Sequence, residues 1–98
     1  MNYTYLLNDI RFEWDTAKAS ESLKKHSISF ETSCEVFFDP FLQIVNVETV
    51  DGERRESIIG LTLDWKTLYV VYVMRDETVR LISARLATRA ERLDYENQ

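Results

Sequence analysis

The stretch Leu68–Arg85, LYVVYVMRDETVRLISAR, decides the fold predicted for this chain. Its first seven residues are apolar on both faces, which is typical of a strand in the middle of a sheet. The polar residues 75–78 form a short turn, and residues 79–85 alternate as a second strand. Two strands joined by so short a connection pair antiparallel. The stretch therefore predicts a β-hairpin at the centre of the fold.

Simple alternation sorts the side chains of the second strand into two sets. Val79, Leu81, Ser83 and Arg85 are expected to point one way. The opposite face would then carry Arg80, Ile82 and Ala84.

Two more strand candidates precede this hairpin. FLQIVNV at 41–47 is followed by the turn-like VDGE at 50–53. RRESIIGLTL at 54–63 alternates, and its inward positions would be Ile59, Leu61 and Leu63. A short turn at 64–67 leads into the central hairpin. Four successive strands with short connections predict an antiparallel meander.

Helix signals fill the region before the meander. IRFEWD at 10–15 alternates as a short strand, and Asp15 is suited to cap a helix that runs to about residue 26. The stripe expected on that helix is Ala19, Leu23 and His26. Ser29 is suited to cap a second helix, which Asp39–Pro40 would end. The apolar face of this second helix would be Phe30, Cys34 and Phe37.

The C-terminal segment completes the predicted topology. Thr88 and Glu91 have the T-x-x-E spacing of a capping box and open a last helix. The predicted order is β-α-α-β-β-β-β-α, an α+β fold with helices against a curved, antiparallel, four-stranded meander. We expect one domain over residues 1–98, with residues 1–10 as a candidate N-terminal extension.

The composition narrows the functional classes. The 98 residues carry 12 Lys and Arg against 17 Asp and Glu, a net charge of −5, whereas nonspecific nucleic-acid binders are strongly basic. With one cysteine, no intramolecular disulfide is expected. The sequence shows neither a signal peptide nor an apolar run long enough to span a membrane. We expect a soluble cytoplasmic protein without membrane contact.

Metal and cysteine chemistry find little support in the sequence. One His and one Cys provide no zinc-ligand set, and no glycine-rich phosphate loop is present. No metal or cofactor is therefore predicted. Cys34 lies on the apolar stripe of the second helix, where a free cysteine is usually a small core residue rather than a nucleophile.

The arginines near the C-terminus are the stronger candidates for a site. Arg85 ends a strand, and Arg89 and Arg92 share a face of the following helix, so the three are able to converge on a phosphate. The alternative is that the helical pair only makes ion pairs on the surface, with Glu96 or Glu53. Arg55 either joins Arg85 or protects a sheet edge.

His26 is the only side chain whose ordinary pKa lies near neutrality. It stands at the end of the first helix. A cation there interacts favourably with the helix dipole, and this alone is enough to explain its position.

Four separated blocks of the sequence resemble one family. FEWD, KHSISFETSCEVFFDP, ERR before IIGLT, and RLISARLATRAERLDYE occur in the order found in the BrnT toxins, covering about residues 12–96. The chain departs from the family pattern at Ser27, where a glycine is usual, and at Arg54, where acids are usual.

The resemblance implies a RelE-like ribonuclease of a type II toxin–antitoxin system that cleaves RNA and inhibits translation. Its partner would be a BrnA-like ribbon-helix-helix antitoxin, in a heterotetramer with two toxins, and operator DNA would be met only through that antitoxin. We predict catalytic roles for His26, Arg55, Arg80 and Arg85. Substrate binding is predicted for Glu53, Ser83, Arg89 and Tyr95.

Two other functions are compatible with the sequence. The first is a catalytically inactive protein that binds the antitoxin and acts as a co-repressor without cleaving RNA. The second is a standalone nucleic-acid-binding module, which the acidic net charge disfavours.

Overall fold

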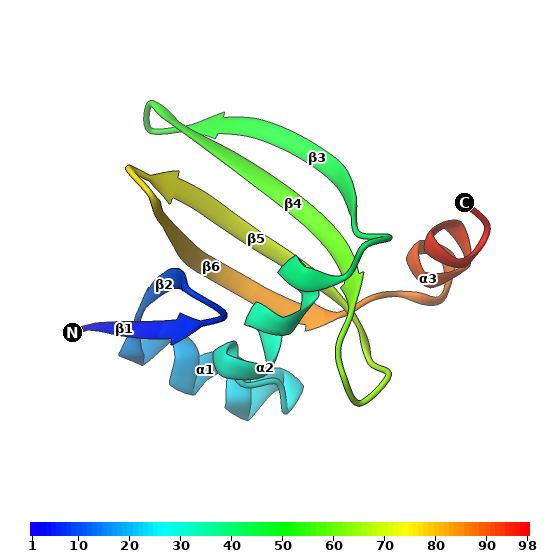
Figure 1. The fold of residues 1–98 in the computed structure, drawn as a ribbon, viewed down its shortest axis with the longest axis horizontal. Helices are drawn as coiled ribbons and strands as arrows, with labels where there is room; N and C mark the ends of the chain where they lie inside the picture. The colour runs from blue at the N-terminus through cyan, green and yellow to red at the C-terminus, as the bar shows by residue number, and fades with distance from the viewer.

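Six strands pair into one sheet, and three α-helices and a 3₁₀ helix lie around it (Figure 1). The structure, a computed structural model, describes residues 1–98. The elements in chain order are β1 (Asn2–Leu7), β2 (Ile10–Asp15), α1 (Thr16–His26), α2 (Phe30–Cys34), the 3₁₀ helix η1 (Glu35–Phe38), β3 (Gln43–Val50), β4 (Glu53–Leu61), β5 (Thr67–Arg75), β6 (Thr78–Leu86) and α3 (Arg89–Glu96). No helix is both long enough and apolar enough to cross a membrane.

The strand order is β1-β2-β6-β5-β4-β3. The antiparallel meander of β3 to β6 confirms the prediction from the second half of the sequence. The predicted element order is wrong in having one strand before α1 instead of two. The sheet is also mixed rather than antiparallel, because β2 runs parallel to β6 through the pairs Arg11–Thr78, Phe12–Val79 and Glu13–Arg80. The fold class, α+β, is as predicted.

The segment expected as a candidate extension forms β1. All of β1 pairs antiparallel with β2, from Asn2 opposite Asp15 to Leu7 opposite Ile10. The rings of Tyr3 and Tyr5 pack on Trp14, with centroids 5.4 and 5.7 Å away. Aromatic pairs of this kind stabilise a strand pair beyond the area that they bury.

α1 keeps its predicted bounds but not its predicted stripe. Its only buried residue is Ser22, and Leu23 is 55% exposed. The Ser22 hydroxyl lies 3.1 Å from the carbonyl oxygen of Ile28 and 3.2 Å from that of Ala84. Of the predicted stripe only Ala19 packs against the core, so this polar contact to the backbone of β6 also positions the helix.

The C-cap of α1 is Ser27, in the left-handed conformation with φ of 57°. This is the backbone region that favours glycine, the residue usual here in the family that the sequence resembles. The Ser27 amide donates a hydrogen bond to the carbonyl of Leu23 at 3.0 Å. The turn that follows His26 thus forms with serine as well.

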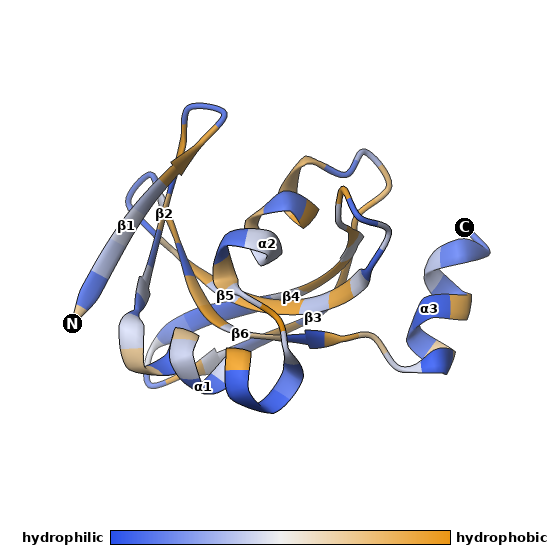
Figure 2. Cartoon of the chain, turned by 90° about the horizontal axis from the view of Figure 1, so that it is seen from below, coloured by the Kyte–Doolittle hydropathy of each residue, from blue (hydrophilic) through white to orange (hydrophobic).

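The other capping residues are as predicted, but the single second helix predicted before Asp39 is divided into α2 and η1. The Ser29 side chain accepts a hydrogen bond from the amide of Thr32, and η1 ends just before Asp39. Thr88 and Glu91 make both bonds of the capping box. α1 and α2 lie on opposite sides of β6 (Figure 2).

The core lies between the sheet and the segment that contains α2 and η1. Burial raises the pKa of the Cys34 thiol, as expected for a core cysteine. Gly60 is needed where β4 approaches η1, since a Cβ there would lie 2.9 Å from the Cβ of Val36. The twelve core residues are Phe12, Trp14, Ile28, Phe30, Cys34, Val36, Ile58, Leu68, Val70, Val79, Leu81 and Ala84.

A β-bulge in β6 overturns the simple alternation predicted for residues 79–85. Val71 of β5 pairs with Ser83 and Tyr72 pairs with Leu81, so Ile82 is an extra residue in the ladder. An extra residue shifts the alternation by one position, so residues on its two sides that simple alternation would place on opposite faces lie on the same face. Arg80 therefore lies on the same face as Ser83 and Arg85, opposite the face predicted for it.

The inward set predicted for residues 54–63 is also partly wrong. Ile58 and Ile59 are both buried, one on each face of the sheet. Leu63 lies beyond the end of β4 and is 85% exposed. The strand ends at Leu61, so the alternation of the sequence continues past the strand itself.

Candidate active site

Three rows of paired residues cross the sheet on the face opposite the core, which we call the cleft face. The rows are Arg85–Tyr69–Ile59, Ser83–Val71–Ser57 and Arg80–Val73–Arg55, each running from β6 through β5 to β4. Residues paired across strands point to the same face of a sheet. The cleft face thus gathers four of the residues predicted for the site.

A cavity of about 410 Å³ lies where α1 meets the cleft face. β4 contributes Arg55 and β6 contributes Ser83, while His26 comes from the last turn of α1. Lys18 and Lys25 line the same cavity. Glu21 is the one acid in the lining and pairs with Lys25 at 2.7 Å, so basic side chains outnumber acidic ones in this cavity.

A second cavity, of about 430 Å³, lies beside the first and shares Lys25 and His26 with it. Its other polar side chains are those of Ser27, Arg85 and Thr88. His26 thus stands at the junction of the two cavities. Each cavity also contains one of the predicted arginines.

Arg55 brings a buried nitrogen without a partner to the first cavity. Its Nε is buried and has no hydrogen-bond partner within the chain. Buried donors are nearly always paired in folded proteins, so this one is suited to an acceptor from outside the chain. Its neighbour Arg54 pairs instead with Glu56, at 3.1 Å, and is exposed.

Arg85 is held in place from two sides. Its two terminal nitrogens donate to the two carboxylate oxygens of Glu91 at 2.8 and 3.0 Å, and its guanidinium lies 4.1 Å above the ring of Tyr69. These hydrogen bonds lower the pKa of Glu91 to about 2 and raise that of Arg85, so both groups stay charged near neutral pH. A bidentate ion pair fixes the plane of the guanidinium.

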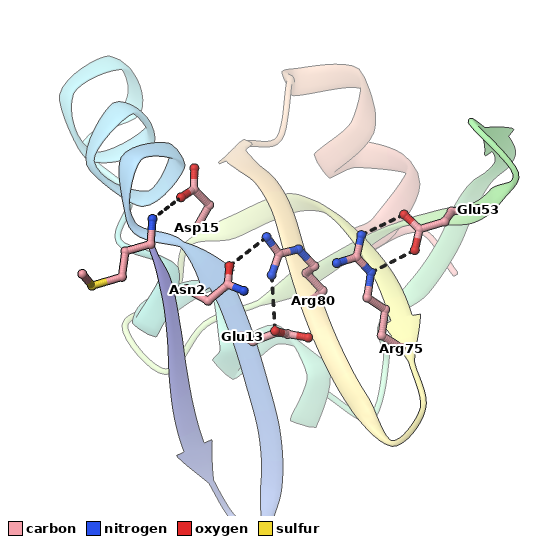
Figure 3. Close-up of polar contacts among 7 residues, drawn as sticks. Asn2, Glu13, Asp15, Glu53, Arg75 and Arg80 are labelled. Carbon is pink, nitrogen blue, oxygen red and sulfur yellow. Dashed lines mark hydrogen bonds and ion pairs between the residues drawn. The ribbon is translucent and has the colours of Figure 1, made fainter.

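Arg80 lies outside both cavities. Its guanidinium contacts Glu13 at 3.3 Å and Asn2 at 3.2 Å (Figure 3). Neighbouring strands are about 4.8 Å apart, so its backbone lies roughly 10 Å from that of Arg55. The structure brings Arg80 to the cleft face but pairs it with the N-terminal hairpin.

Three predicted substrate-binding residues lie away from the cavities. Glu53 is bound by Arg75 at 2.9 Å (Figure 3), and this contact lowers its pKa. Arg89 is exposed on α3. The Tyr95 hydroxyl donates to the Asp39 carboxylate, and burial raises the pKa of Tyr95 to about 12. Tyr95 therefore anchors α3 to the rest of the fold.

Two site residues, Lys18 and Lys25, were absent from the sequence prediction. They are seven positions apart on α1, a spacing that places both on one side of a helix. This spacing could have been recognised in the sequence, but the prediction for this helix considered only an apolar stripe. No group of three or more His, Cys, Asp or Glu side chains is arranged to hold a metal ion.

The fold is that of a small α+β protein, and its cleft brings together basic side chains of the kind that bind phosphate groups in other proteins. A family model described as "Ribonuclease toxin, BrnT, of type II toxin-antitoxin system" matches residues 14–91. The chain belongs to this family. An antitoxin is therefore its expected partner class, and the resemblance noted in the sequence is confirmed.

A solved structure agrees with this assignment at the level of the fold. The crystal structure of the Brucella abortus ribonuclease toxin BrnT, at 1.1 Å resolution, is similar with a TM-score of 0.52. The two sequences are 21% identical over 78% of this chain and 94% of that one. A search of curated proteins gives no match.

Proposed function

We propose that this protein is a RelE-like endoribonuclease that cleaves RNA in the cytoplasm and thereby inhibits translation. Membership of a family of ribonuclease toxins supports the activity in general terms. The single observation that carries the proposed site is Arg55, whose buried Nε lacks a partner in a cavity shared with His26 and Ser83. A phosphodiester supplies the acceptor that this arginine lacks.

The proposed reaction is a transesterification within the RNA. The 2′-oxygen forms a bond to phosphorus while the bond from phosphorus to the next 5′-oxygen breaks. The 2′-hydroxyl loses its proton and the 5′-oxygen gains one, so the products are a 2′,3′-cyclic phosphate and a 5′-hydroxyl. The protein has to align the hydroxyl, stabilise the added negative charge and assist the proton transfers.

Each task has a candidate in the cleft. Arg55 is placed to stabilise the charge on phosphate, and His26 is the candidate for proton transfer. Arg85, rigid on Tyr69 and beside His26, would hold the same phosphate or its neighbour. Ser83 would donate a hydrogen bond to the substrate.

The remaining residues are assigned according to their distance from the cavities. Arg80 would act through its charge on the cleft face rather than by direct contact. We assign no substrate contact to Glu53, Arg89 or Tyr95, whose side chains lie elsewhere.

We predict that cleavage needs no metal ion, because Arg55, Lys18 and Lys25 line the cavity proposed for the phosphate and can stabilise its added charge. Purified protein incubated with single-stranded RNA in excess EDTA should release fragments that end in a 2′,3′-cyclic phosphate or the derived 3′-phosphate. The end groups are measured by mass spectrometry. Cleavage lost in EDTA and restored by Mg²⁺ would contradict metal independence, and no cleavage in any buffer would favour an inactive, antitoxin-binding protein.

We further propose a BrnA-like ribbon-helix-helix antitoxin as the partner, bound over the cleft. Such antitoxins are obligate dimers, and a two-fold partner recruits two toxins. The co-purified complex should therefore contain two copies of each chain by light scattering and should not cleave RNA. Only the antitoxin would contact operator DNA directly. A 2:2 complex that still cleaves RNA at the full rate would contradict the covering of the cleft.

A further inference from the structure

The tip of the β4–β5 hairpin exposes two large apolar side chains. Leu63 is 85% exposed and Trp65 is 81% exposed. With Phe38, Pro40 and Leu61 they line a groove of about 270 Å³, which we call the hairpin groove. None of these residues lines either cavity of the active site. The proposed ribonuclease activity therefore gives them no role.

The hairpin tip is held in one conformation. The amide of Thr62 donates to the carbonyl of Lys66 at 2.8 Å, and the amide of Lys66 donates to the Thr62 hydroxyl at 3.0 Å. The amide of Leu63 donates to Glu35 of η1 at 3.0 Å. These bonds fix the backbone that carries Leu63 and Trp65, so little backbone entropy is lost when a partner binds.

Trp65 has a backbone conformation that is costly for its residue type. Its φ is +66°, whereas the other non-glycine residues with positive φ are Asn8, Asp9, Ser27, Asp51 and Asp76. Short polar residues of this kind tolerate the left-handed region better than a tryptophan does. An exposed tryptophan gains almost nothing from packing in return. Its presence there is explained if the indole contacts a partner.

The charge around the hairpin groove indicates the chemistry of that partner. Among the lining residues are the carboxylates of Glu35 and Asp39, and no basic side chain is among them. Asp64, at the tip, adds a third acid, and Lys66 is the one nearby base, 3.4 Å from Asp64. A surface that combines tryptophan, leucine and phenylalanine with acids is complementary to apolar side chains flanked by Lys or Arg.

We propose that the hairpin groove is a docking site for a basic amphipathic segment of another protein. Leu63 and Trp65 are its apolar anchors, and Glu35 and Asp64 are its charged contacts. Because the groove shares no residue with the cleft, docking there leaves RNA cleavage unchanged.

The test uses a fluorescein-labelled, 18-residue peptide of Leu and Lys at helical spacing, with a matched peptide that has Glu in place of Lys. The Lys peptide should bind saturably by anisotropy and shift the emission of Trp65 to the blue, since Trp14 is only 2% exposed. The Glu peptide should not bind. Cleavage of RNA should proceed at the same rate with the Lys peptide bound.

Variants separate docking from folding. Leu63→Ser should raise the Kd at least about tenfold. The double variant Glu35→Gln, Asp64→Asn keeps the hydrogen-bond acceptors and removes two charges, so it should raise the Kd about tenfold. Trp65→Gly should abolish binding and raise the Tm by about 4–8 °C, because glycine relieves the backbone strain.

Several results would overturn the proposal. These are equal binding of the two peptides, wild-type affinity in Leu63→Ser, or a lower Tm in Trp65→Gly, which would make the indole a structural element. A dimer of the free protein that Trp65→Gly dissociates would assign the groove to a second copy of the chain. RNA cleavage is measured in a separate assay. A protein that cleaves no RNA would contradict the proposed active site but not the proposed docking site.

Discussion

Replacing Arg55 with alanine should slow RNA cleavage by about 10²–10³-fold, the usual cost of removing one preorganised donor from a site of charge development. Arg55 projects from β4, where the sheet fixes its direction, into the cavity that it shares with His26. Its buried Nε has no partner within the chain. Removing the side chain therefore breaks no hydrogen bond of that nitrogen, and circular dichroism should show a folded protein.

Arg54→Ala is the matched control for this variant. It removes the same charge from the adjacent residue, but Arg54 pairs with Glu56 at the surface. An exposed ion pair contributes about 0–1 kcal/mol, so cleavage should fall by less than about fivefold. Rates are compared by single-turnover kinetics on one RNA. A folded Arg55→Ala protein that cleaves as fast as Arg54→Ala would remove Arg55 from the active site.

Replacing His26 with glutamine should slow cleavage by about 10²–10⁴-fold, the range that a general acid or base contributes. His26 is the only histidine of the chain and lies at the junction of the two cavities. Glutamine keeps a polar side chain of similar length but does not exchange protons near neutral pH. Binding of a non-cleavable RNA with 2′-O-methyl groups should change little.

Lys24→Gln provides the control for the His26 variant. Lys24 lies in the same last turn of α1 and lines neither cavity. Its loss should leave the cleavage rate within about a factor of two. If His26→Gln lowered RNA affinity and left the single-turnover rate intact, His26 would be a binding residue and the proton-transfer role would be wrong.

The second half of the fold was predictable because its signals are local. Residues 68–74 are apolar throughout, short polar turns separate the strands, and Thr88 with Glu91 marks the start of α3. The parallel contact of β2 with β6 has no such signal. It joins Arg11 to Thr78 across most of the chain, and nothing in the sequence of either strand specifies its neighbour.

The candidate site shows the same division between local and non-local information. Arg55, Ser83, Arg85 and His26 were singled out from the sequence, and they line the two cavities. The face of Arg80 was assigned wrongly because the bulge at Ile82 cannot be read from an otherwise alternating strand. Tyr95 lies within a stretch of the sequence that resembles the family, but its hydroxyl is committed to Asp39.

The wide spacing of the cleft residues along the chain also has a consequence for the order of events during protein synthesis. The cleft takes His26 from the first third of the chain, Arg55 from the middle and Arg85 from the last strand. Contacts between such distant residues form late, because the loop between them has to close first. A nascent chain that still lacks β6 lacks Ser83 of the first cavity and Arg85 of the second, so both cavities are incomplete. We therefore expect the ribosome to complete and release this toxin before the chain gains the ability to cut RNA.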